Sequence, residues 1–242
     1  MRNKLVPSPQ SLKEVKFFMH EIGVRETINL CGLTFNIETL KMTWLAMGIV
    51  ILVACLATRN LKVVPQGWQN FVEMIILWLH DQIDAMMGRR GRMLAPFIVG
   101  LFMFLLASNL IGLVPLMASP TNDLNTTLGL ALLVVVIVHC LGLYFKGGHY
   151  IAHFFQPTPV FVIINMIEEI AKPITLAFRL FGNILAGEIL IIVLLKLMPI
   201  WMPIPSVCWL AFSIFISCVQ AVIFTMLSMA YLANAVKEDH AE

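Results

Sequence analysis

The sequence predicts an all-α integral membrane protein, a multi-pass helical bundle with a surface amphipathic helix and a long, steeply tilted C-terminal helical hairpin. Of its 242 residues, 60% are hydrophobic and only 12% are charged, whereas soluble domains are about 45–50% apolar and about 25% charged. Apolar runs long enough to cross a bilayer follow one another along the chain. This composition excludes a soluble globular enzyme, a disordered chain and a basic nucleic-acid-binding protein.

We interpret residues 1–242 as a single membrane domain that begins with an extracytoplasmic tail over 1–41. The first apolar run predicts a span over 42–58, near the short limit of about 17–25 residues for a membrane helix. The next stretch, 64–88, mixes apolar and charged side chains, and Pro65 stands near its start. This pattern predicts an amphipathic helix at the membrane surface. A water-exposed helix that packs on the bundle is the alternative.

Two further spans are predicted over 93–115 and 126–145. A basic segment over 89–92 precedes the first span and Lys146 follows the second, whereas the turn between the spans has no Lys or Arg. Short cytoplasmic loops are rich in Lys and Arg, so the basic loops are placed in the cytoplasm. The N-terminus is then expected outside the cell and the C-terminus in the cytoplasm.

The last third of the chain predicts two helices that are too long for upright spans. The first, over 160–197, has 38 residues. At about 1.5 Å per residue this is about 57 Å of helix, against about 30 Å of hydrocarbon. Pro173 can bend it, and Gly182 and Gly187 leave room for the close approach of another helix. The second helix, over 206–236, follows a proline-rich turn, so the two helices form a tilted antiparallel hairpin.

Charged side chains in the first of these helices point to chemistry at membrane depth. A charged group costs about 2.5–3.5 kcal/mol at the centre of a membrane helix, so it normally faces water or a partner. Arg179 has no acid three or four residues away, where helical ion pairs form. Asn183 shares its face, whereas Glu188, nine positions on, lies on the opposite face. Arg179 is therefore expected to meet an anion from outside this chain; the loop residue Asp123 is the alternative partner.

Other polar groups accompany Arg179. Glu168, Glu169 and Lys172 precede it in the same helix. They either face the same polar region or lie among the lipid headgroups, with Lys172 extended toward the interface. Ser213 and Gln220 recur at helical spacing in the last helix, on the face that also carries Ser217 and Tyr231.

Several motifs in this part of the chain resemble those of one known family. The letters FRLFGN over 178–183 and AGE over 186–188 are joined by PTNDLNT over 120–126 and QA at 220–221. Together they resemble subunit a of the F-type rotary ATP synthases, in its bacterial and chloroplast forms. The resemblance extends over about residues 92–231 in the right order.

The resemblance implies a stator that abuts a rotating ring of c subunits, each with one membrane-buried carboxylate. It also implies b-type peripheral stalk subunits and the remainder of the complex as partners, in a lipid bilayer, with no nucleic acid. Two half-channels would pass H⁺ or Na⁺ to and from the ring, and Arg179 matches the essential arginine between them. Asn183, Glu188 and Gln220 match its polar ion path. The full set of candidate residues for ion translocation is Arg179, Asn183, Glu188, Gln220, Ser213, Glu168, Glu169, Lys172, Asn109, Asp123 and Asn125.

Such a subunit is not catalytic alone, and no cofactor or metal is expected. His149 and His153 form H-x-x-x-H, but the other histidines form no second box that would complete a metal site. A bacterial inner membrane is the expected location, with the thylakoid membrane as the alternative. Two positions depart from some family members: Ser213 stands where they have a histidine, and Asn165 where they have an acid.

A stand-alone ion-coupled secondary transporter is the alternative function. It would also explain polar groups and interrupted helices inside the membrane. Such transporters usually carry an internal repeat. The two long helices at the end of the chain have no counterpart in its first half, so the sequence shows no such repeat.

Overall fold

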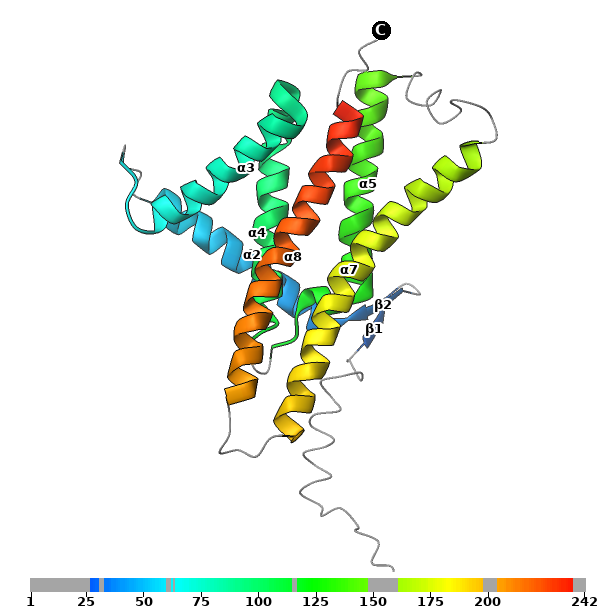
Figure 1. Ribbon diagram of the computed structural model, residues 1–242. Helices are drawn as coiled ribbons and strands as arrows, with labels where there is room; N and C mark the ends of the chain where they lie inside the picture. The colour runs from blue at the N-terminus through cyan, green and yellow to red at the C-terminus, as the bar shows by residue number, and fades with distance from the viewer. Residues whose placement is uncertain are drawn as a thin grey trace, which may run out of the picture.

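The computed structural model describes residues 27–30, 33–59, 62, 64–114, 117–147, 161–197 and 204–236. Helices form most of this part of the chain, and they pack as a bundle in which some helices are strongly inclined to others (Figure 1).

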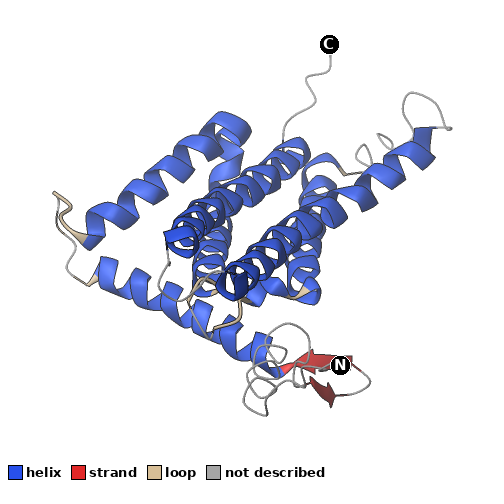
Figure 2. Cartoon of the chain, turned by 60° about the horizontal axis from the view of Figure 1, so that its bottom comes forward, coloured by secondary structure: helices blue, strands red, loops and turns tan. Residues whose placement is uncertain are grey.

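A short β-hairpin precedes the helices. Strand β1 (Thr27–Leu30) pairs antiparallel with β2 (Leu33–Asn36), with Thr27 opposite Asn36. Figure 2 shows the two strands at the edge of the bundle, beside the start of the first helix. The sequence predicts only a tail over 1–41 for this segment. Strands of four residues are too short to give a clear alternation of apolar and polar side chains.

Helix α2 (Ile37–Thr58) begins before the span predicted over 42–58. Its buried residues are small: Thr39, Ala46 and Ala57. Its large apolar side chains, such as Trp44, stay exposed. A helix that is apolar on its outer surface and contacts the bundle through small residues suits a lipid environment.

Helices α3 (Trp68–Gly91) and α4 (Ala95–Ile111) form a hairpin, where the sequence predicts helices over 64–88 and 93–115. The chain turns at Gly88, whose φ of 62° interrupts the helix and suits a residue without a Cβ. The short helix η1 (Arg92–Leu94) completes the turn.

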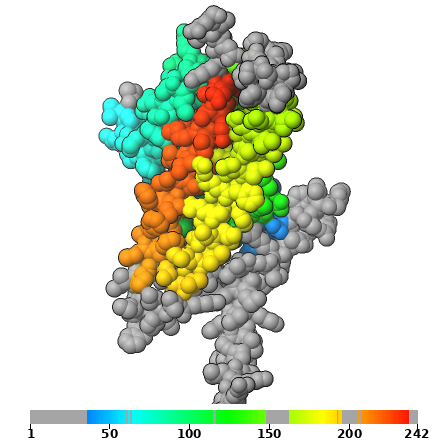
Figure 3. Space-filling view, turned by 45° about the vertical axis from the view of Figure 1, so that its right-hand side comes forward, coloured from blue at the N-terminus to red at the C-terminus, as the bar shows by residue number. Residues whose placement is uncertain are grey.

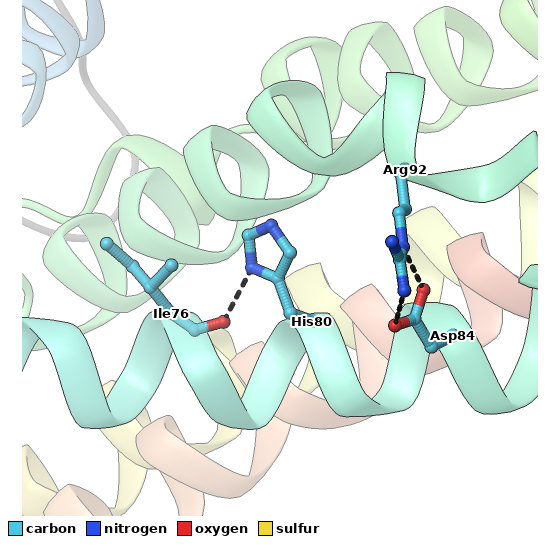
Figure 4. Close-up of polar contacts among 4 residues, drawn as sticks. All are labelled: Ile76, His80, Asp84 and Arg92. Atoms are coloured by element: carbon cyan, nitrogen blue, oxygen red, sulfur yellow. Dashed lines mark hydrogen bonds and ion pairs between the residues drawn. The ribbon is translucent and has the colours of Figure 1, made fainter. Parts of the chain in front are cut away.

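Polar contacts hold this turn in place. Arg92 reaches back to Asp84, and its Nε and Nη2 lie 2.9 and 2.8 Å from the two carboxylate oxygens (Figure 4). His80 Nδ1 lies 2.9 Å from the carbonyl oxygen of Ile76, one turn earlier in α3. Planar, two-point contacts between Arg and a carboxylate are the geometrically most specific ion pairs.

The remaining helices pack against one another and against α3 and α4. Helix α5 (Leu124–Lys146) follows the short helix η2 (Pro120–Asn122). The long helices α7 (Phe161–Leu197) and α8 (Ile204–Val236) run antiparallel and lie side by side on one face of the molecule (Figures 1 and 3). Helix α7 is strongly inclined to α5 in Figure 1 and continues through Pro173.

Five helical segments in the described part of the chain are long and apolar enough to cross a membrane. The second of them, Trp68–Ile111, joins α3 to α4. The predicted all-α, multi-pass membrane bundle is therefore confirmed, with the β-hairpin as an addition. The five segments are Ile37–Thr58, Trp68–Ile111, Leu124–Lys146, Val162–Ile191 and Val207–Val236.

Candidate functional site

The orientation of α7 is set by one apolar stripe. Pro173, Leu176, Ala177 and Leu180 are buried against the bundle, at the spacing of one helical face. At about 100° per residue, Arg179 projects well away from this stripe. The structure accordingly leaves Arg179 exposed at the surface of the chain.

Arg179 belongs to a polar stripe of its own. Glu168, Lys172, Thr175 and Asn183 share its side of α7 at intervals of three or four residues. Among the residues that the structure describes, Arg179 forms no hydrogen bond and no ion pair. Its guanidinium is therefore presented outward, as the sequence predicts for a cation that meets an anion from another chain.

The two glycines beside this stripe leave open space. A Cβ added at Gly182 or Gly187 would meet no atom within 4 Å. Neither glycine is therefore needed for close packing inside the described part of the chain. The room that they leave lies on the same helix as Arg179 and is available to a neighbouring helix.

At one end of α7, a polar network forms around η2. Asp123 caps α5, because its Oδ1 accepts from the backbone N–H of Asn125 at 3.0 Å. Its Oδ2 accepts from Thr39 Oγ1 at 3.2 Å and from the side chain of Asn36. Asp123 therefore binds the start of α2, and it is not the partner of Arg179 that the sequence left open. The side chain of Asn125 is exposed.

Asn109 joins this network to the bundle. Its Nδ2 donates to the carbonyl oxygen of Ser217 in α8 at 3.3 Å, and its Oδ1 accepts from Thr121 Oγ1 at 3.0 Å. Ser119 continues the network: its hydroxyl lies 2.7 Å from that of Thr121 and donates to the carbonyl oxygen of Ser108 at 3.0 Å. A buried amide thus bridges α4, η2 and α8.

Asn122 brings Glu188 into the same region. Its side-chain N–H donates to Glu188 Oε2, across 66 positions of sequence. From the sequence, Glu188 is predicted as an ion-translocation residue, but Asn122, which lies in the PTNDLNT motif, is not. A short polar turn without Lys or Arg was the one signal that could have identified it.

Helix α8 supplies a buried polar face. Ser213, Ser217 and Gln220 are all buried, at the predicted spacing of four and three residues. Gln220 Nε2 has no hydrogen-bond partner among the described residues. An unpaired buried amide is costly, so this nitrogen is suited to bind water or a group from another chain.

A second polar cluster lies toward the other end of α7. Lys172 Nζ is 2.6 Å from Glu169 Oε1 and 3.3 Å from Glu168 Oε1. It also lies 5.8 Å from the centre of the Tyr231 ring in α8. His139 of α5 lies beside Glu169, with 3.9 Å between Nε2 and Oε2. Sequence reasoning missed His139, which stands alone in an apolar run.

The two clusters flank Arg179 along one helix. Glu169 precedes Arg179 by ten residues and Glu188 follows it by nine, or about 15 Å and about 13 Å along the axis. The contact of Glu169 with His139 lies in the C-terminal half of α5, and that of its neighbour Lys172 with Tyr231 lies in the C-terminal half of α8, whereas Glu188 contacts η2. The polar groups therefore divide into two sets at opposite ends of the bundle.

The described residues contain no group of three or more His, Cys, Asp or Glu that could hold a metal ion. The predicted pair His149 and His153 lies outside the described residues.

Comparison with known proteins agrees with this architecture. The family model "ATP synthase A chain" matches residues 40–233. An "ATP synthase subunit a" from Desulforamulus reducens is 46% identical over 222 residues, which cover 88% of this chain and 85% of the relative. The match includes every helix described above except the end of α8 and the start of α2. The chain belongs to the ATP synthase A chain family, whose members are subunits a of F-type ATP synthases.

Proposed function

We propose that this chain is the stator that carries ions to and from a rotating ring of carboxylate-bearing subunits, through two half-channels separated by Arg179. One observation supports this most strongly: an exposed arginine without an internal partner among the described residues, placed between two polar clusters at opposite ends of the bundle. A subunit with one continuous polar pore would have no reason to divide its polar groups in this way.

The exposed face of α7 suits a moving partner. Arg179 lies on this face, and Gly182 leaves space next to it. Phe178 and Ile174 flank it with exposed apolar surface. Exposed apolar surface next to an exposed cation allows another helix to slide past and still attracts a carboxylate.

The charge of Arg179 is large enough to discharge such a carboxylate. A carboxylate about 4 Å from a cation gains about 4 kcal/mol at an effective dielectric of 20. This equals about three pKa units, enough to release a proton from a passing acid. Arg keeps its charge at any relevant pH, whereas a buried Lys does not always do so. The membrane potential supplies about 2.3 kcal/mol per charge per 100 mV to drive the movement.

The two clusters are proposed to line the access routes. Glu188, Asn122, Asn109, Ser213 and Gln220 would serve the route at the η2 end. Glu168, Glu169 and Lys172 would serve the other, while Asp123 and Asn125 act by holding η2 in place. The basic turns near Arg92 and Lys146 favour a cytoplasmic location for the second end. The complex would lie in a bacterial cell membrane, with the c-ring and b-type stalk subunits as partners.

Replacement of Arg179 tests the proposal. In the reconstituted complex, Arg179→Ala is expected to abolish ATP synthesis and ATP-driven ion pumping, and to leave a passive ion leak. Thr175→Ala, one turn away on the same stripe, serves as the matched control and should retain synthesis. Full ATP synthesis by the Arg179→Ala complex would refute the assignment.

The transporter alternative predicts a different result. The purified chain, reconstituted without other subunits, would then carry out substrate-coupled transport. Membership of the ATP synthase family favours the stator, which requires the ring for any coupled movement.

A further inference from the structure

We propose that His139, which stands outside every motif of the sequence, is the terminal proton-exchange group of the route that contains Glu169, and that the ion on this route is therefore H⁺. This inference rests on the proposed function and deepens it. The observation that carries it is the position of an imidazole from α5 against a carboxylate of α7 that also binds a lysine.

Glu169 is a bridging carboxylate. Its Oε1 lies 2.6 Å from Lys172 Nζ, and its Oε2 lies 3.9 Å from His139 Nε2. Each oxygen thus has its own nitrogen neighbour, from α7 on one side and α5 on the other. A protonated imidazole at this distance is an ion-pair partner, whereas a neutral imidazole accepts a proton from Oε2 only after the two side chains close to hydrogen-bond distance or share a water.

The formal charges of the cluster do not cancel while His139 is neutral. Glu168 and Glu169 contribute two negative charges and Lys172 one positive charge, which leaves one negative charge in excess. Tyr231 of α8 faces Lys172 through its ring and adds no charge in its neutral form. Protonation of His139 brings the four charged groups to neutrality. One proton taken up by the cluster would therefore bring its formal charge to zero.

Of the two side chains, that of His139 is the more exposed. The side chain of His139 is 39% exposed and that of Glu169 is 22% exposed. A proton that arrives on Glu169 Oε2 passes to His139 Nε2 through a bridging water, or directly once the two side chains close to hydrogen-bond distance; the O–H bond breaks as the N–H bond forms. The carboxylate then pairs with Lys172, and the imidazolium releases the proton to water. The reverse sequence takes a proton up.

Histidine suits this step because it changes charge between about pH 5 and pH 8. A sodium ion gains nothing from an imidazolium, which repels it. If His139 exchanges the transported ion, that ion is therefore H⁺ and not Na⁺.

The test uses the complete ATP synthase in vesicles, with ATP-driven H⁺ pumping measured while the pH is varied on one side at a time. The parent complex should show an inflection in the pumping rate as the pH is varied on the side that the Lys146 end of α5 faces. His139→Gln should remove this inflection. It should also lower the rate at about pH 7.5 about tenfold, less than the about 10²–10⁴-fold of a sole proton-transfer group, because Glu169 remains.

Two further variants separate proton exchange from packing. His80→Gln, in α3 and bonded within its own helix, should leave the inflection unchanged. The double variant His139→Glu with Glu169→His exchanges the two groups and should restore the inflection even if His139→Gln assembles poorly. A uniform loss of rate with the inflection retained in His139→Gln would overturn the inference, as would pumping of Na⁺ that does not depend on His139.

The outcome is independent of the test of Arg179. If Arg179→Ala abolishes synthesis while His139→Gln keeps the parent pH profile, the stator function stands and the role of His139 is wrong. If Arg179→Ala retains synthesis, the proposed function itself fails.

Discussion

Asn109 is the residue whose loss should most directly weaken the polar network at the η2 end. It is almost fully buried, and its side chain makes two hydrogen bonds, to the Ser217 carbonyl at 3.3 Å and from Thr121 at 3.0 Å. Each such bond contributes about 0.5–1.5 kcal/mol, and truncation of a buried side chain adds a cavity. Asn109→Ala should therefore lower the free energy of unfolding by about 2–4 kcal/mol.

The neighbouring residue provides a matched control. Ser108 is equally buried in the same helix, but its hydroxyl has no hydrogen-bond partner among the described residues. Ser108→Ala removes an unpaired polar group, so its effect on stability should lie within about 0.5 kcal/mol of zero or be stabilising.

Unfolding of the purified subunit in mixed micelles of increasing SDS content, followed by tryptophan fluorescence, measures both variants. A double-mutant cycle of Asn109→Ala with Thr121→Val should give a coupling energy of about 1 kcal/mol. Equal stability losses in Asn109→Ala and Ser108→Ala, or a coupling energy of zero, would show that the two hydrogen bonds do not hold α4, η2 and α8 together.

Three further changes test other parts of the structure. A Cβ at Gly112 would lie 2.5 Å from Ser119 Cβ, so Gly112→Ala should lower the free energy of unfolding by about 1–3 kcal/mol in the same SDS titration. Gly100→Ala is the control, because a Cβ there meets nothing within 4 Å, and it should not cause this loss. A similar loss in both variants would contradict the close approach of Gly112 and Ser119. Lys172→Met removes the nearest cation from the half-buried Glu169 and should cost about 1–3 kcal/mol, which Lys172→Arg should largely recover. Glu188→Gln should slow ion uptake and change its dependence on the pH at the η2 side; an unchanged pH profile counts against Glu188 as a relay.

The sequence predicts the helices well because their physical causes are local. Hydrophobic runs and proline positions were enough to place α7 at 160–197, against Phe161–Leu197 in the structure. Periodicity was also enough to place Ser213, Ser217 and Gln220 on one face of α8, and the structure buries all three. Both inferences depend only on residues within one helix.

Contacts between distant segments could not be predicted in the same way. The bond between Asn122 and Glu188 joins η2 to α7, and Asp123 turned out to bind Asn36 and Thr39. His139 gives no signal in sequence, because a lone histidine in an apolar run has no periodic partner. These pairs depend on how the helices pack, and neither hydropathy nor spacing encodes that packing.

The central claim is that the face of α7 around Arg179 meets the carboxylate-bearing helix of the ring. Cysteine cross-linking in the assembled complex tests it most directly, in a background where the native cysteines are replaced. A cysteine at Gly182, exposed and open in this structure, should form a disulfide with a cysteine next to the ring carboxylate. A cysteine at Trp44 of α2, equally exposed, should not. Cross-linking from Trp44 but not from Gly182 would contradict the account.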